Sequence, residues 1–436
     1  MDKSWFKIRG YLHFDTPISL ENATKLVSSP QLISTHSFYP FISCTLSTPK
    51  LKKNENGELT REFKNRTISY AAHKDSHIFS YYAYILGEKY ENLITNKYDN
   101  INQSVLAFRK LGRNNIDFAK QAFSYIKKIK NCSVIALDIS DFFGNLNHKI
   151  LKKKWCEVLG VSTLPADHFA VFKAITQYTI IPKDFLFKEF KISPHTSRSN
   201  NRKRICTPNE FRNLRRKYKL SLPFQNENFF ISNKEKGVPQ GSPISALLSN
   251  VYMIDFDVFL NDEIKKIDGL YLRYCDDILC IIPTSEVDNI KELINQEIEK
   301  LKLQINNNKT EIINFIYDAN KKKILNERKL QYLGFILKDE SITIRPAAFT
   351  KYSKKMKRGV SLAKQTQRKY NSIRARKCIP NKKLYTKKLY SAYSHFGKRN
   401  FVSYGKRAAV IMGSSPIKKQ LKPLWKKLQC RIKADY

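Results

Sequence analysis

Two adjacent aspartates, Asp276 and Asp277, lie between the apolar runs Tyr271–Tyr274 and Ile278–Ile282. The two runs predict β-strands joined by a tight turn, with the acidic pair at their junction. Adjacent carboxylates repel each other, and removing them from water costs free energy. Because hard divalent cations such as Mg²⁺ prefer carboxylate oxygens, the pair is typical of a metal site. An Asp-Asp hairpin turn without any function explains these two residues equally well.

A third carboxylate, Asp138, follows the short apolar run Val134–Leu137. Such a run predicts a buried strand, and the residue at its end lies where the strand meets a site or solvent. If the Asp276-Asp277 hairpin lies beside this strand, three carboxylates come together. Three carboxylates can hold two Mg²⁺ ions that clamp the attacking and leaving oxygens of a phosphoryl transfer. A solvated carboxylate at a strand end is the alternative for Asp138.

Between these positions, the block Gly237–Pro243 combines four glycine or proline residues with Gln240. Its prolines and glycines predict a bent loop, and Ser242 is a candidate cap for a following helix. That helix is predicted by an apolar stripe at helical spacing: Ile244, Leu247, Leu248, Val251 and Tyr252. A loop of small residues with an exposed Gln can lie close to a bound nucleotide or template. A plain loop before a core helix is the alternative.

In this order, Asp138, the block Gly237–Pro243 and Tyr274–Asp277 resemble motifs A, B and C of reverse transcriptases. The segment Leu303–Thr310 is similar to motif D, and Leu330–Phe335 to motif E, the primer grip. The resemblance extends from about Arg61 to Phe349. It implies an α+β chain with the right-hand polymerase fold, which has fingers, an antiparallel-sheet palm and a helical basic thumb.

The resemblance also implies roles for individual residues. Two Mg²⁺ ions, or Mn²⁺, would be held by Asp138, Ile139, Asp276 and Asp277. Nucleotide contacts would come from Lys64, Arg66, Phe143, Gln240 and Gly241. The primer grip would be formed by Tyr332, Leu333 and Gly334, and Lys309 would donate a proton to the leaving pyrophosphate. The primer 3′-hydroxyl would attack the α-phosphate of the incoming nucleotide, mainly through positioning and charge neutralisation.

Phe143 lies five residues after Asp138, at the position of the family's steric gate. An aromatic ring there would exclude a ribose 2′-hydroxyl, which predicts deoxynucleotide substrates. Core packing is the alternative for Phe143, because the neighbouring Phe142 competes for the same role. Lys309 is equally well explained as a solvated surface lysine.

The chain carries 79 lysines and arginines against 38 acidic residues, a net charge of +41 over 436 residues. Such an excess indicates a polyanionic partner, which in this family would be an RNA template, the DNA product and dNTP substrates. A membrane surface is the rival partner, but no run of some 18 apolar residues exists. The eight cysteines form no C-x-x-C pair, which favours a reduced cytoplasm and argues against structural zinc.

We predict fingers with an N-terminal extension over residues 1–131, a palm over 132–346 and a basic thumb over 347–436. A basic insertion at 183–223 in the palm either wraps RNA or forms a solvated loop. The thumb segment contains 26 lysines and arginines but one acidic residue, Asp435. Helices are predicted at Ile78–Leu86, Ile116–Ile129, Lys351–Ile373 and Lys382–Phe396.

The fingers segment from Arg66 to Glu91 resembles that of bacterial defence-associated and abortive-infection reverse transcriptases. This resemblance implies an antiphage role and DNA synthesis on a dedicated non-coding RNA. In some relatives it implies untemplated or protein-primed synthesis. A non-catalytic, maturase-like RNA-binding protein is another alternative, which three intact aspartates disfavour. An RNA-directed RNA polymerase is disfavoured by Phe143 and by Gln240.

Overall fold

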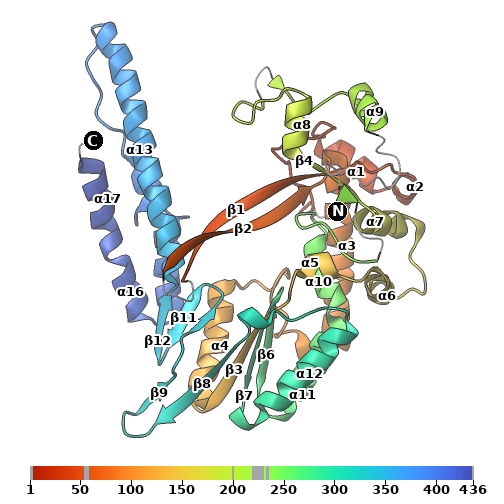
Figure 1. Ribbon diagram of the computed structural model, residues 1–436, viewed down its shortest axis with the longest axis vertical. Coiled ribbons are helices and arrows are strands. Elements are labelled where there is room, and N and C mark those ends of the chain that lie inside the picture. The colour runs from red at the N-terminus through yellow and green to blue at the C-terminus, as the bar shows by residue number, and fades with distance from the viewer. Residues whose placement is uncertain (1–2, 54–57, 199–200, 219–229, 232–234, 435–436) are drawn as a thin grey trace.

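The computed structural model describes residues 3–53, 58–198, 201–218, 230–231 and 235–434 (Figure 1). Helices and sheets are mixed along the chain, and the three sheets have the strand orders β2-β1-β4-β5, β6-β7-β3-β8-β9 and β10-β11-β12. The five-stranded sheet lies at the base of the molecule, with helical bodies rising on either side of a gap (Figure 1). The expected α+β class is confirmed.

The five-stranded palm sheet is antiparallel throughout. Its strands are β3 (Cys132–Asp138), β6 (Leu270–Tyr274), β7 (Asp277–Ile282), β8 (Glu311–Asp318) and β9 (Lys323–Leu325). The two strands predicted around the acidic pair, and the one predicted before Asp138, are therefore confirmed. The central strand β3 pairs with β7 on one side and β8 on the other.

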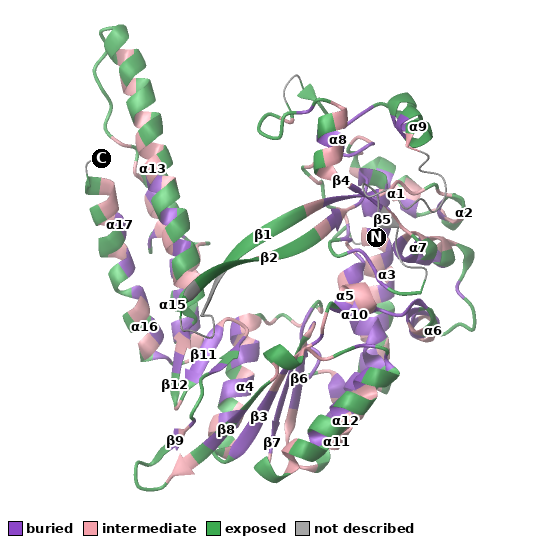
Figure 2. Cartoon of the chain, viewed as in Figure 1, coloured by how far each residue is buried: buried purple, intermediate pink, exposed green. Residues whose placement is uncertain are grey.

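Both faces of the palm sheet are covered at β3, β6 and β7, which explains why these strands are apolar without alternation. Side chains alternate between the two faces along β3. Cys132 and Val134 join the core with α4 (Asn115–Ile129). Ile135 and Leu137 join the opposite core, which includes residues of α11 (Ile254–Lys266) and α12 (Val287–Lys300). The sheet is thus a rigid floor between two helical layers (Figure 2).

The fingers contain a hairpin of β1 (Phe41–Lys53) and β2 (Leu59–Tyr70), paired over 12 residues. It projects from the fingers in the direction of the thumb, above the palm sheet (Figure 1). Two short strands complete its sheet, β4 (Thr179–Pro182) and β5 (Phe230–Ile231). The helices of this side are α1 (Leu20–Val27), α2 (Pro30–Ser34), α3 (His73–Lys97), α5 (Phe142–Asn145), α6 (His148–Leu159), α7 (Ala166–Thr176) and α10 (Ser245–Tyr252).

The basic insertion is more ordered than a solvated loop over its described residues. It contains α8 (Lys183–Glu189) and α9 (Pro208–Lys217), and α9 begins with a capping box formed by Thr207 and Glu210. Phe211 and other apolar residues of the insertion form a separate small core with Ile42 of β1. Residues 199–200 and 219–223 of the predicted insertion lie outside the described ranges.

The thumb follows a small antiparallel sheet of β10 (Leu330–Tyr332), β11 (Phe335–Lys338) and β12 (Ser341–Ile344). Its helices are α13 (Pro346–Arg376), α14 (Lys387–Tyr393), α15 (Phe401–Ile411), α16 (Ser415–Leu421) and α17 (Pro423–Lys433). None of the helices in the described ranges is long and apolar enough to cross a membrane.

The helix predicted at Lys351–Ile373 exists and is longer, whereas the one predicted at Lys382–Phe396 is too long. The structure has only α14 there. The backbone N–H of Lys382 donates to the side chain of Asn371 at 3.0 Å, so this segment lies along α13 instead of continuing a helix. This tertiary hydrogen bond satisfies the backbone N–H of Lys382 outside any helix.

Candidate active site

The acidic pair lies on a strained two-residue turn between β6 and β7. Tyr274 pairs with Asp277, which leaves Cys275 and Asp276 as the loop. Cys275 has φ +61°, a left-handed conformation at the first loop position, as in type II′ turns. Glycine is the usual residue there, so a buried cysteine in this position stores backbone strain.

Asp138 lies directly opposite Asp277 in the pairing of β3 with β7. Directly opposed residues of an antiparallel pair share one face, with Cβ atoms about 5 Å apart. The turn therefore brings the carboxylates of Asp138, Asp276 and Asp277 to one end of the palm sheet. Two segments 138 positions apart in the chain reach this arrangement through backbone register alone.

The three carboxylates open onto a cavity of about 1050 Å³ between the palm and the fingers. Nine of the residues singled out from the sequence line it: Lys64, Arg66, Asp138, Ile139, Phe143, Gln240, Asp276, Asp277 and Lys309. The cavity thus combines carboxylates on the palm side with cations on β2 and near β8. Such a site suits an anionic ligand that carries its own cations.

Gly241 does not line the cavity but lies against strand β2. Its φ is +115°, and a Cβ atom there would lie 2.6 Å from the carbonyl oxygen of Ser69 on β2. The backbone N–H of Ser69 donates to the Gln240 carbonyl at 2.8 Å. Gly241 therefore allows the palm loop to dock closely on the fingers strand, which leaves the Gln240 side chain facing the cavity.

The expected capping role of Ser242 is not what the structure shows. Helix α10 begins at Ser245, after Ile244, and no side-chain cap is present. The Ser245 hydroxyl donates instead to the Pro239 carbonyl at 2.8 Å, which closes the loop on itself. The apolar stripe predicted for this helix is buried at its five positions, Ile244, Leu247, Leu248, Val251 and Tyr252.

The electrostatics of the site centre on Asp277. Burial, together with the charges of Asp276 and Asp138, raises the pKa of Asp277 to about 6. Asp277 is nevertheless exposed to the cavity, so solvent weakens the contribution of burial to this rise in pKa. The ammonium groups of Lys309 and Lys64 act in the opposite direction.

Divalent cations would fit the type and placement of these side chains, since they would relieve the mutual repulsion of the carboxylates. In the part of the chain that the structure describes, no three acidic, histidine or cysteine side chains already form a ligand set. Here the Asp138 carboxylate is paired with the Lys309 ammonium group, which holds a positive charge at this position. A metal bound by Asp138 would therefore have to displace Lys309.

A buried ion pair below the turn was not expected from the sequence. Arg273 and Asp257 are fully buried, and the guanidinium donates to both carboxylate oxygens at 2.6 and 2.5 Å. Another guanidinium nitrogen donates to the Cys275 carbonyl and to the Asn250 side chain, each at 3.2 Å. Burial disfavours the charged guanidinium, but the charge and hydrogen bonds of Asp257 outweigh it and raise the pKa of Arg273. The pair thus holds the turn that carries the acidic residues.

One signal for this pair was present in the sequence. Arg273 interrupts an apolar strand that is covered on both faces, and a buried charge requires a partner. The partner could not be named, because the helix before the strand offers four acids: Asp255, Asp257, Asp262 and Glu263.

The two neighbouring phenylalanines after Asp138 have different environments. Phe142 is 3 % exposed and belongs to the core. Phe143 is half-buried, lines the cavity, and its carbonyl accepts the Val238 N–H at 2.8 Å. Phe108, an exposed ring with φ +61°, lines the cavity from another side; its segment Leu106–Lys110 resembles the family's motif near the nucleotide, but Phe108 was not among the predicted site residues. Its neighbour Arg109 is instead buried in an ion pair with Glu91.

The residues expected in the primer grip form the β10–β11 hairpin turn beside the cavity. Leu333 and Gly334 both have positive φ, and the Leu333 carbonyl accepts the Asn115 side chain at 3.0 Å. Tyr332 is buried, and burial together with the Asp277 charge raises its pKa. The hairpin thus lies between α4 and the three aspartates of the site, next to the start of the thumb.

A family model described as "Reverse transcriptase (RNA-dependent DNA polymerase)" matches residues 84–337, more than half of the chain. With the sheet order described above, this match confirms the expected right-hand polymerase fold. No curated protein matches the chain by sequence.

Solved telomerase structures are similar to the chain at low identity. Apo telomerase from Candida tropicalis, truncated from its C-terminal domain, has 14% identity and a TM-score of 0.42, over 75% of this chain and 61% of that chain. Telomerase from Candida albicans with a fragment of telomeric RNA has 11% identity and a TM-score of 0.41, over 96% of this chain and 66% of that chain. The chain thus spans less than two thirds of the length of the first structure.

Proposed function

Since the chain belongs to the reverse transcriptase family, we propose that it is an RNA-directed DNA polymerase that adds deoxynucleotides to a primer 3′ end. The observation that carries this proposal is the direct pairing of Asp138 with Asp277, beside Asp276, at the edge of a 1050 Å³ cavity. The cavity also contains Lys64 and Arg66, whose charges suit a triphosphate.

In this proposal Asp138, Asp276, Asp277 and the backbone of Ile139 would hold two Mg²⁺ ions. Bound Mg²⁺ would supply Lewis-acid activation of the primer hydroxyl and charge neutralisation at the phosphates. Lys309 leaves the Asp138 carboxylate when the site is loaded. Its ammonium group then protonates the pyrophosphate as the bond to the α-phosphorus breaks.

Substrate selection in the proposal rests on the cavity wall. Phe143 excludes a ribose 2′-hydroxyl, since both phenylalanines line the cavity but Phe142 is almost fully buried in the core and Phe143 is the more exposed of the two. Gln240 lies on the opposite palm loop, and the docking of Gly241 on β2 fixes that loop relative to the fingers. Tyr332, Leu333 and Gly334 support the primer end.

We further propose that the protein is a bacterial antiphage enzyme that copies a dedicated non-coding RNA. The charge of +41 and the 26 basic residues after residue 346 support a long polyanionic partner. The ordered basic insertion gives a second surface for RNA. In this proposal the fingers span residues 1–131, the palm 132–346 and the thumb 347–436.

The test is to purify the protein with its bound RNA, sequence that RNA, and add labelled dNTPs with Mg²⁺. One enriched RNA together with complementary DNA supports the whole proposal. DNA without complementarity to any bound RNA supports untemplated or protein-primed synthesis instead. RNA binding without any synthesis contradicts the polymerase assignment and favours a maturase-like role. The variant Asp276→Asn/Asp277→Asn is the negative control, and Asp288→Asn, an exposed aspartate on α12, is the matched substitution.

A further inference from the structure

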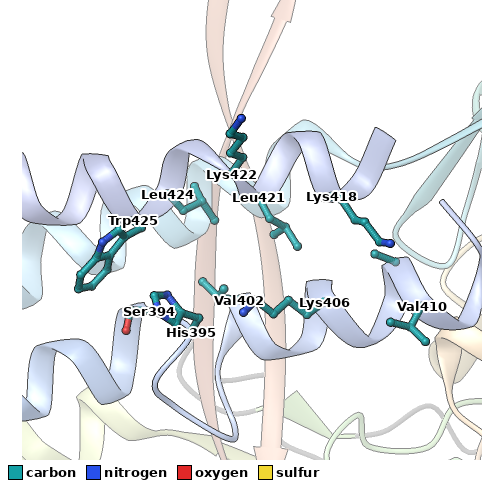
Figure 3. Close-up of a pocket in the computed structure, with 11 residues that line it drawn as sticks. Ser394, His395, Val402, Lys406, Val410, Lys418, Leu421, Lys422, Leu424 and Trp425 are labelled. Carbon is teal, nitrogen blue, oxygen red and sulfur yellow. The ribbon is translucent and has the colours of Figure 1, made fainter. Parts of the chain in front are cut away.

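A second cavity, of about 410 Å³, lies within the thumb and away from the acidic site. It is a groove between α15 on one side and α16 with α17 on the other (Figure 3). Its floor is apolar and includes Val402, Ala409, Leu421 and Leu424. The side chains of Lys406 and Lys418 extend along the gap between the helices (Figure 3).

The groove lies on the opposite face of α15 from the primer grip. Tyr404 points toward the primer grip, where it stacks on Phe335 of β11 and accepts a hydrogen bond from Asn115, and Phe401 packs on Tyr352 of α13. Val402, Lys406 and Val410 line the groove. At about 100° per residue, these two sets lie roughly 170° apart around the helix. A duplex held at the primer grip would therefore contact the other side of α15.

One end of the groove is aromatic. The ring of Trp425 packs against His395, Phe396 and Tyr390 at centroid distances of 5.2, 5.5 and 5.3 Å. This cluster is incompletely covered, since Phe396 is 64 % exposed and Trp425 is half-buried. At the other end of the groove Val410 is 74 % exposed. Apolar surface at both ends and along the floor calls for a ligand with flat, apolar faces.

The charge around the groove selects an anion. Lys406, Lys418 and Lys422 line it and are exposed, and the Lys422 side chain points away from the gap, at the outer edge of the groove (Figure 3). Between residues 347 and 434 the sequence contains no Asp or Glu. A nucleotide offers both required properties, because its base stacks on aromatic rings while its phosphate pairs with lysine.

We propose that this groove binds an unpaired segment of RNA that lies outside the primer–template duplex. Bases insert over the apolar floor against Trp425, and phosphates contact Lys406, Lys418 and Lys422. The inference rests on the proposed function in taking RNA as the partner, but it assigns that RNA a second site. The thumb would then hold the duplex on one face and the RNA beyond the copied region on the other.

The test measures binding of a labelled oligouridylate of about 12 nucleotides, with the primer-grip side saturated by a blunt RNA–DNA hybrid. The triple variant Lys406→Ala/Lys418→Ala/Lys422→Ala should weaken oligouridylate binding about tenfold and lower the salt slope by roughly 2. The control triple Lys419→Ala/Lys426→Ala/Lys427→Ala removes the same charge from exposed positions on α16 and α17 that do not line the groove. It should change binding less than about twofold.

Val410→Glu places an anion in the groove at an exposed position, so folding is preserved, and should weaken binding by about the same factor. With 4-thiouridine in the oligonucleotide, cross-links should fall on the peptide containing Trp425. Equal losses in the two triple variants, complete displacement by the hybrid, or cross-links elsewhere would each overturn the proposal. Binding of an acidic peptide in preference to the oligonucleotide would do so as well.

A primer-extension assay with a pre-annealed primer and the same protein samples tests the proposed function separately. Wild-type protein that binds oligouridylate in the groove but extends no primer contradicts the polymerase assignment and leaves the groove proposal standing. Groove variants should still extend a short pre-annealed primer at close to the wild-type rate. Loss of extension together with binding would assign these residues to the duplex and overturn the inference.

Discussion

In the palm, Asp138 and Asp277 face each other across one strand pair, whereas the thumb segment spreads 26 basic residues over some 90 positions. The palm carboxylates are held by specific contacts: the register of β3 and β7, and the hydrogen bond from Arg273 to the Cys275 carbonyl. The thumb cations are mostly exposed at the ends of long side chains.

This difference separates two ways of using charge. Like charges held together on a rigid strand turn require a counter-charge, and the loss of one member changes the field felt by the others. Flexible lysines that face a polyanion act nearly independently, each contributing through counterion release. We therefore expect large, non-additive effects of substitutions in the palm and small, additive effects in the thumb.

The largest effect is expected from the acidic pair. Asp276→Asn/Asp277→Asn removes two negative charges from the proposed metal site, so the rate of nucleotide addition should fall at least about a thousandfold. RNA affinity should stay within about twofold, because the basic surfaces are unchanged. Primer extension and filter binding on the same protein measure both quantities. Extension that survives within tenfold of wild type would contradict the role given to these carboxylates.

The next effect concerns the buried pair below the turn. Asp257→Asn leaves the Arg273 guanidinium buried without its counter-charge and should destabilise the palm by about 3–5 kcal/mol. The double variant Arg273→Leu/Asp257→Leu should recover much of this loss, because no charge remains buried. Its activity should stay low, since the Cys275 carbonyl loses its donor. Thermal unfolding and primer extension check the two parts, and equal unfolding temperatures for the single and double variants would contradict the reasoning.

The strands and the acidic turn could be predicted because the signals are local, whereas the grouping of Asp138 with the turn was implied by the resemblance to reverse transcriptases. Apolar runs bounded by Asp138 and by Asp276-Asp277 determine strands within a few residues, and a strand with both faces covered needs no alternation. The residues that support the site could not be predicted in the same way. Arg273 contacts Asp257 only because α11 packs on the sheet. Lys309 pairs with Asp138 although the two residues are 171 positions apart in the chain.

Gly241 and Ser242 show a second limit. Small residues in a loop permit several uses, and the sequence does not say whether a glycine approaches a ligand or another strand. The structure places Gly241 against β2, so a glycine is needed at this position for a tertiary contact between the loop and the strand. The predicted 382–396 helix failed similarly, because Asn371 on a distant turn of α13 binds the backbone of Lys382.

A moderate effect is expected at the cavity wall. Phe143→Val should reduce the preference for deoxynucleotides over ribonucleotides by roughly 10- to 100-fold, as expected when a shape contact with one group is lost. Phe142→Val is the matched control: its ring is in the core, so it should lower stability without changing the preference ratio. Ratios of kcat/KM for dNTP and NTP provide the measurement. Equal shifts in both variants would assign Phe143 to packing.

The smallest effects are expected in the thumb groove that adjoins the primer grip, a cavity of about 820 Å³ lined by Lys351, Lys355, Tyr404 and others. Each of Lys351→Ala and Lys355→Ala should weaken primer–template binding only about two- to threefold and lower the salt slope by roughly 0.9. The double variant should show the sum of the two free-energy changes, because exposed lysines couple weakly through solvent.

Additive changes in binding free energy would distinguish the lysines of this groove from the carboxylates of the palm. If the thumb lysines act as independent counter-charges, the double-mutant coupling in binding free energy should be close to zero at every salt concentration. A strong coupling that persists at high salt would show that the two lysines hold one phosphate in a fixed geometry. The thumb would then recognise its ligand by position, as the palm does, and the contrast between the two regions would fail.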